Sequence, residues 1–156
     1  NAAFIKSKVQ FPEGDLNRDR SLQGQSPFMV NAGLFYYNDN TGLMVTALYN
    51  IIGKRIVAVG RSSPNEWEDI PNIYEMPRNV VNLAVSKKVN NHFEVKLGLK
   101  DLLNEKIEMI QTVNTTVNMS DLTGGADTST KYFNSNQITK SYQPGRYFMM
   151  GITYKF

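Results

Sequence analysis

The stretch that decides the fold is GRYFMMGITYKF, Gly145 to Phe156, because its side chains alternate in character. One side of the extended chain would carry the apolar series Phe148, Met150, Ile152, Tyr154 and Phe156. The other side would carry the mixed series Tyr147, Met149, Gly151, Thr153 and Lys155. A period of two residues is typical of a β-strand with one apolar face. The stretch therefore predicts a strand, and the question is what solvent its apolar face meets.

The same period recurs along the chain, whereas helical periodicity is nearly absent. About six strands are expected: Ala2 to Gln10, Pro27 to Tyr37, Leu43 to Val59, Asn79 to Val89, His92 to Leu103, and the closing stretch Gly145 to Phe156. Gly53, inside the third expected strand, is expected to mark a bulge or a bend.

The expected connections alternate between long and short. The short ones are the turns at Asn38–Gly42 and Asn90–Asn91. The long ones are polar and cover residues 11–26, 60–77 and 104–144. In an antiparallel sheet the short turns then fall at one end and the long loops at the other, as in outer-membrane barrels.

Composition excludes several classes of protein. The 156 residues contain no cysteine, so neither a disulfide framework nor a thiolate metal site is possible. No apolar run of about 18 residues is present, which excludes a membrane-spanning helix. The net charge of +3 comes from scattered lysines and arginines, and no basic run indicates nucleic-acid binding. A mean hydropathy of -0.37 is compatible with a membrane barrel, because alternation hides apolar residues from averages.

Strand length and the placement of aromatic residues favour a barrel over a soluble sandwich. Phe148 to Phe156 spans about 26 Å at about 3.3 Å per residue, and a tilt of about 40° converts this into a rise of about 20 Å. Phe35, Tyr36 and Tyr37 crowd one strand end, as interfacial aromatic girdles do. We therefore expect an all-β, antiparallel, up-and-down transmembrane β-barrel segment. Six strands would leave open edges in hydrocarbon, so the chain is expected to be the C-terminal part of a larger barrel.

Five segments, in order, resemble the C-terminal barrel of TonB-dependent outer-membrane receptors. They are LQGQSPFMVNAGLFY, LYNIIGKRIVAVG, IYEMPRNVVNLAVSKKV, FEVKLGLKDLLNEK and YQPGRYFMMGITYKF. The resemblance covers nearly all of the chain except the middle of the expected 104–144 loop. It implies that residues 1–156 supply about six strands of a barrel with about twenty-two strands, in the outer membrane of a Gram-negative cell.

The resemblance also implies an activity and partners. Such receptors take up a nutrient ligand, with an N-terminal plug inside the barrel and the TonB–ExbB–ExbD complex supplying energy. The remainder of the barrel, the plug, outer-membrane lipid and the barrel-assembly machinery are therefore implied partners. A surface lipoprotein is a further partner by analogy. Neither the plug nor the segment that contacts TonB is expected in these residues.

Candidate site residues come from the closing strand and the long loops. By the resemblance, Met150, Ile152, Tyr154 and Phe156 would carry the signal for barrel assembly, and they would also face lipid. Trp67 and Tyr74 are candidates for stacking on a flat ligand, with loop packing as the ordinary alternative. Asp15, Asn17 and Asp19 alternate like the start of a calcium loop, but Arg20 and Ser26 replace its glycine and glutamate. A solvated loop is the ordinary alternative for these three residues.

No acid–base pair or metal cluster indicates an enzyme, and no cofactor is expected. Two other functions remain open at this point. The first is a non-transporting or passive outer-membrane barrel that acts as a structural member of a surface complex. The second is a soluble carbohydrate-binding sandwich.

Overall fold

The computed structural model describes residues 1–13, 19–64, 69–118, 124–125 and 130–156. This part of the chain contains no helix, and so none long and apolar enough to cross a membrane. Its ten strands are β1 (Ala2–Phe4), β2 (Phe28–Asn38), β3 (Leu43–Ile52), β4 (Arg55–Ala58), β5 (Ile73–Glu75), β6 (Arg78–Lys88), β7 (Phe93–Lys100), β8 (Ile107–Asn118), β9 (Thr130–Tyr142) and β10 (Tyr147–Tyr154). The prediction of an all-β chain is confirmed.

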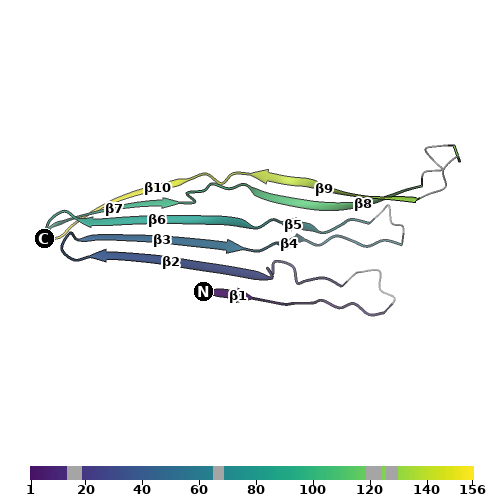
Figure 1. Ribbon diagram of the computed structural model, residues 1–156, viewed down its shortest axis with the longest axis horizontal. Coiled ribbons are helices and arrows are strands. Elements are labelled where there is room, and N and C mark those ends of the chain that lie inside the picture. The colour runs from purple at the N-terminus through teal and green to yellow at the C-terminus, as the bar shows by residue number, and fades with distance from the viewer. Residues whose placement is uncertain (14–18, 65–68, 119–123, 126–129) are drawn as a thin grey trace.

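The strands form two antiparallel sheets that lie end to end. The six-stranded sheet has the order β1-β2-β3-β6-β7-β10, and the four-stranded sheet has the order β4-β5-β8-β9. The chain passes directly from β3 to β4, from β5 to β6, from β7 to β8 and from β9 to β10 (Figure 1). Each of these pairs of strands thus forms one long interrupted strand of an up-and-down meander.

The connections sort by length as predicted. The short turns from β2 to β3 and from β6 to β7 lie at one end of the meander, where Phe156 also lies (Figure 1). The connections from β1 to β2, from β4 to β5 and from β8 to β9 begin and end toward the opposite end.

Gly53 marks the predicted bend, because the long strand breaks there between β3 and β4. Its N–H donates a hydrogen bond to the carbonyl oxygen of Phe28 at 2.9 Å. A Cβ atom at position 53 would lie 2.6 Å from a ring carbon of Phe28 and 2.9 Å from the Ser26 hydroxyl. The chain can approach β2 this closely only because residue 53 has no side chain.

The prediction of one long loop over residues 104–144 is wrong. Within it, β8 and β9 form a hairpin whose register runs from Ile107 opposite Tyr142 to Asn118 opposite Thr130. Its strands are rich in threonine, asparagine, glutamine and serine, so apolar alternation is weak and gave no strand signal. Backbone hydrogen bonding across the hairpin does not require such alternation.

Three other predicted boundaries also need correction. The second expected loop contains β5 and a bridge between Arg61 and Ile70. The first expected strand is shorter, because β1 ends at Phe4 and is followed by only an isolated bridge from Val9. The fifth expected strand ends at Lys100, because the next residue, Asp101, has a left-handed φ of 54°.

The sheets form a single layer without a conventional core. Ile56, at 3% exposure, is the one buried hydrophobic residue among those the structure describes. A sandwich would bury one face of each sheet against the other, whereas these sheets continue into one another along the strands. In the described chain β1 pairs only with β2, and β10 pairs only with β7, so the six-stranded sheet is open. No barrel closure is seen within the described residues.

Candidate functional site

One face of the six-stranded sheet, hereafter the apolar face, is apolar across its five longer strands. The register aligns its side chains in rows across the sheet. Two central rows contain Tyr36, Val45, Val85, Leu97 and Met150, and next to them Leu34, Ala47, Leu83, Leu99 and Phe148. Met150 is 71% exposed and Phe148 is 76% exposed. Side chains this apolar and this exposed form a continuous surface that the described chain leaves uncovered.

The apolar face has a defined length. On β3 it runs from Leu43 to Ile51, which is about 26 Å at about 3.3 Å per residue. At the short-turn end an aromatic cluster borders it. The ring of Tyr154 lies 4.9 Å from that of Phe93, 5.1 Å from that of Phe156 and 6.1 Å from that of His92, measured between centroids.

The other end of the apolar face is polar. The Tyr49 hydroxyl donates to Asn79 Oδ1 at 2.6 Å. The Asn79 backbone N–H in turn donates to Glu105 Oε2 at 2.7 Å, and its side-chain amide donates to both Glu105 oxygens. These groups satisfy one another where the apolar rows stop. The apolar face is therefore a band bounded by polar or amphipathic groups at both ends.

The opposite face, hereafter the polar face, is mixed. On β6 and β7 it carries charged and amide side chains: Arg78, Asn82, Lys88, Glu94, Lys96 and Lys100. On β2 and β3 it carries Asn31 and Asn50, whose side-chain amides are hydrogen-bonded to each other. The two faces therefore differ in the way that a sheet between an apolar and an aqueous phase requires.

Several large apolar side chains nevertheless lie on the polar face. Phe35 is 75% exposed, and Leu48 and Met149 are also exposed. Phe35 and Leu48 extend over Gly33, where a Cβ atom would meet each of them at 3.1 Å. Phe35 and Leu48 cover Gly33, which explains the position of these side chains on the polar face. Most of the surface of Phe35 nevertheless remains exposed.

An ion pair lies at the junction of the two sheets. Arg78 Nη1 is 2.6 Å from Asp101 Oδ2, and the side chains are 22% and 9% exposed. The backbone N–H of Asp101 donates to Asn82 Oδ1 at 3.0 Å. The second carboxylate oxygen of Asp101, Oδ1, is buried and has no hydrogen-bond partner among the described residues.

The structure places the predicted residues of the closing strand on one surface. Met150, Ile152 and Tyr154 follow one another along the apolar face of β10, opposite Leu97, Val95 and Phe93 of β7. Phe156 lies just beyond β10, edge-on to Tyr154. Their role as a signal for barrel assembly stays a prediction.

The predicted ligand-stacking residues are placed only in part. Trp67 lies outside the described residues. Tyr74 lies in β5 and is half-buried, and the ammonium nitrogen of Lys54 sits 4.1 Å from the centre of its ring. Because this cation–π contact occupies one ring face, stacking of a ligand on that face would have to displace Lys54.

The predicted calcium-loop residues are also placed only in part, since Asp15 and Asn17 lie outside the described residues. Asp19 Oδ2 is 2.6 Å from the ammonium of Lys8, and Oδ1 accepts a 3.3 Å hydrogen bond from the Phe11 N–H. The Lys8 hydrogen bond, followed by that from Phe11, lowers the pKa of Asp19. Among the described residues no group of three His, Cys, Asp or Glu side chains could hold a metal ion.

Replacing Lys8 by glutamine should raise the pKa of Asp19 toward its ordinary range. A lowered carboxylate pKa adds stability above the unfolded-state pKa, and this stability is lost as the pH falls through the folded-state value. The free energy of unfolding of the variant should therefore depend less on pH than that of the wild type, and the difference should be confined to acidic pH. Titration of the Asp19 carboxyl by NMR measures the change, and Lys6→Gln, an exposed lysine two residues away, should leave the pKa unmoved.

No protein-family model, curated protein or solved structure matches this chain.

Sequence reasoning missed two features of the site. The Arg78–Asp101 pair joins residues 23 positions apart, and no local pattern indicates it. The second feature is that Lys88 and Lys155, which are far apart in the sequence, lie at the same end and on the same face of the sheet. Their convergence depends on β10 lying beside β7, which the alternation alone does not establish.

Proposed function

We propose that this chain forms part of the wall of a transmembrane β-barrel in the outer membrane of a Gram-negative cell. The observation that carries the proposal is the uncovered apolar face of a single-layered sheet, with charged and amide side chains behind it. In water such a face would be a severe aggregation liability. Against lipid it is the ordinary outer surface of a barrel, which alternates apolar-out and polar-in.

The dimensions of the apolar face support the same proposal. Its length of about 26 Å on β3 corresponds to a rise of about 20 Å for a strand tilted by about 40°. Outer-membrane barrels have an apolar band about 25 Å tall with aromatic girdles at its borders. The cluster around Tyr154 then lies at the periplasmic border, and the Tyr49–Asn79–Glu105 group lies at the outer one. The short turns are periplasmic and the long connections extracellular.

The open edges of the sheet require partners within the proposed barrel. Unpaired backbone groups in hydrocarbon cost several kcal/mol each. The free edges of β1 and β10 therefore pair with further strands, and a barrel of about twenty-two strands supplies them. Outer-membrane lipid covers the apolar face, and the barrel-assembly machinery inserts the strands during biogenesis.

The specific proposal is a TonB-dependent receptor that takes up a nutrient ligand. It draws on the ordered resemblance of five segments, and exposed apolar side chains on the polar face support it. In the barrel this face lines the interior, where Phe35, Leu48 and Met149 would meet water if the lumen were open. A folded plug would cover them. By the same resemblance, TonB–ExbB–ExbD energises transport, and a surface lipoprotein is a candidate lid.

The alternative is a passive or non-transporting barrel that acts as a structural member of a surface complex. The charged residues on the polar face of β6 and β7 favour this alternative, since they suit a water-filled lumen. The two proposals differ in whether the lumen is plugged.

Conductance of the full-length polypeptide in planar bilayers distinguishes them. A plugged receptor should show no stable open-channel conductance until its plug is removed or displaced by mild denaturant. A passive barrel should conduct as soon as it is inserted. A protein that stays monomeric and folded in plain buffer, with no affinity for detergent or lipid, would contradict both proposals.

A further inference from the structure

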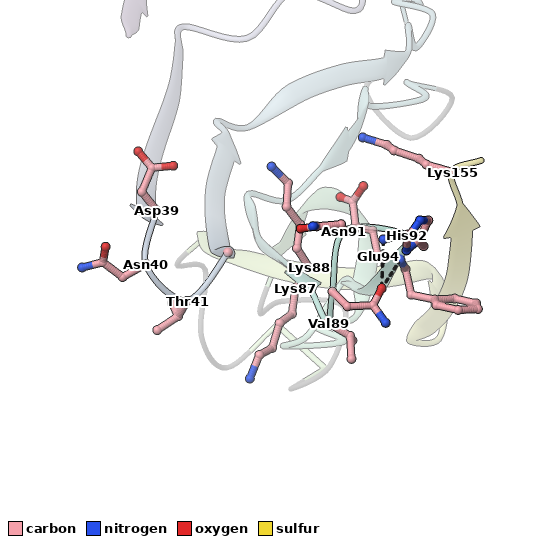
Figure 2. A pocket seen from close by; sticks show the side chains of 13 residues that line it. Asp39, Asn40, Thr41, Lys87, Lys88, Val89, Asn91, His92, Glu94 and Lys155 are labelled. Atoms are coloured by element: carbon pink, nitrogen blue, oxygen red, sulfur yellow. Dashed lines mark hydrogen bonds between the residues drawn. The ribbon is translucent and has the colours of Figure 1, made fainter.

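A hollow of about 690 Å³ opens at the short-turn end of the sheet. The turn from β2 to β3, the turn from β6 to β7 and the residue after β10 line it (Figure 2). Its charged lining residues are Lys87, Lys88, Lys155, Asp39 and Glu94. In Figure 2 the side chains of Lys88, Lys155 and Glu94 extend to one side of the turns, and that of Lys87 extends to the other. This agrees with the register, which places Lys88 opposite Glu94 and Lys87 opposite Val95.

The two carboxylates of the hollow already have partners, whereas its lysines have none among the residues that the structure describes. Glu94 Oε1 is 3.5 Å from the ammonium of Lys96. Asp39 Oδ1 accepts a 2.8 Å hydrogen bond from the Tyr37 hydroxyl. No carboxylate or carbonyl among the described residues accepts from the ammonium groups of Lys87, Lys88 or Lys155. Among the charged groups that line the hollow, those without a partner in the described chain are therefore cationic.

The backbone around the hollow is held by its own hydrogen bonds. Asn90 Oδ1 accepts from the N–H groups of His92 and Phe93 at 2.9 and 2.8 Å. The N–H of Lys88 donates to the Gly42 carbonyl at 3.0 Å, and that of Lys155 donates to the His92 carbonyl at 2.8 Å. These bonds tie the two turns and the end of β10 together, so both lysine backbones are fixed before any ligand binds.

We propose that this hollow binds a phosphate group through the ammonium groups of Lys88 and Lys155. A phosphate offers several strong acceptor oxygens, which two or three ammonium groups can share. A bound cation would instead meet the ammonium groups of Lys88 and Lys155 and carboxylates that already have partners. The inference goes beyond the proposed function, because a free phosphate could bind here whether or not the sheet is part of a receptor.

The same chemistry is offered by a free phosphate and by the headgroup of an anionic phospholipid. In one arm of the test, inorganic phosphate is titrated into the full-length protein in detergent, and binding is followed by NMR. In the other arm, co-purified lipid is quantified after reconstitution into nanodiscs of phosphatidylglycerol mixed with phosphatidylcholine. If the ligand is a free phosphate, the double variant K88Q/K155Q should bind inorganic phosphate at least about tenfold more weakly than the wild type. If it is a lipid headgroup, the same variant should lose its enrichment in phosphatidylglycerol by a similar factor. Both losses are expected because charge-assisted hydrogen bonds contribute strongly to affinity.

Two further variants complete the test. K106Q removes an exposed lysine at the start of β8, far from the short turns, and should change neither arm. E94Q removes a negative charge from the lining and should tighten binding several-fold, with a weaker effect at high salt. Loss of phosphate binding alone identifies a free phosphate, and loss of phosphatidylglycerol enrichment alone identifies a lipid headgroup. Equal behaviour of wild type and K88Q/K155Q in both arms, or an equal effect of K106Q, would overturn the proposal.

Discussion

Replacing Met150 by arginine is expected to lower the free energy of unfolding in a lipid bilayer by about 2–4 kcal/mol, the cost of an arginine at the midplane of a barrel surface. Met150 lies on the apolar face of β10, in a central row with Leu97 and Val85, and is 71% exposed. Because the described chain covers none of this row, lipid is its proposed solvent. Equilibrium unfolding in urea, on the full-length protein in vesicles, measures the effect.

The neighbouring residue provides a matched control. Met149 has the same side chain, lies at almost the same height on β10 and is 50% exposed, but it faces the opposite way, toward Gly98 of β7. Met149→Arg should cost less than about 1 kcal/mol, because arginine on the polar face keeps its contact with water or a polar surface. If both variants lowered the free energy of unfolding equally, the membrane assignment would be contradicted. The loss would then come from placing an arginine anywhere in β10 and not from contact of the apolar face with lipid.

The contrast between Met149 and Met150 also shows how much of the fold the sequence could predict. Alternation depends only on the two-residue period of a strand, so β2, β6 and β10 were predicted close to their observed bounds. The expected strand from Leu43 to Val59 covers both β3 and β4, and the expected strand from His92 to Leu103 contains β7 but extends beyond its end at Lys100. Gly53 was predicted as a bend because an isolated glycine in a strand has few other roles. The single-layered arrangement of the described strands did not follow from the alternation, which a sandwich would share.

The strands that the sequence pattern did not predict are either polar on both faces or very short. In the β8–β9 hairpin, Thr112 lies opposite Asn136 and Gln111 lies opposite Gln137, and hydroxyl and amide groups point to both sides. Binary patterning cannot distinguish such a strand from a loop. β5 has only three residues, and Pro71 and Pro77 flank it closely. Prolines this near normally indicate a break in the strand.

The candidate site was predictable only where one strand carried it. The apolar series of Gly145 to Phe156 needed no tertiary information, and the structure places its members on one face. The junction of the two sheets is different, because Asp101 meets Arg78 through an unusual backbone conformation. The side chain of Lys100, the last residue of β7, lies on the polar face. If β7 continued as a regular strand, the carboxylate of Asp101 would therefore lie on the apolar face. The positive φ of Asp101, 54°, turns it back toward Arg78.

Separate loss of either partner of this pair is therefore expected to be costly. Asp101→Asn keeps a residue type that tolerates positive φ but leaves Arg78 without its counter-ion in a site where only 22% of its side chain is exposed. Arg78→Met leaves the carboxylate of Asp101, already short of one hydrogen-bond partner, without its cation. Each change should cost about 3 kcal/mol, because an unpaired buried charge is far less stable than a buried pair.

The double variant tests whether this cost comes from the pair. Arg78→Met with Asp101→Asn should be less destabilised than the sum of the single changes by about 2 kcal/mol, because no unpaired charge is left behind. The same cycle on Lys8 and Asp19, an ion pair with side chains 55% and 42% exposed, should give a much smaller coupling, because water screens exposed charges. Urea unfolding of the four Arg78 and Asp101 proteins measures the coupling. If the single costs simply add, the two charges do not stabilise each other at the adjoining ends of β6 and β7, and the positive φ of Asp101 must have another cause.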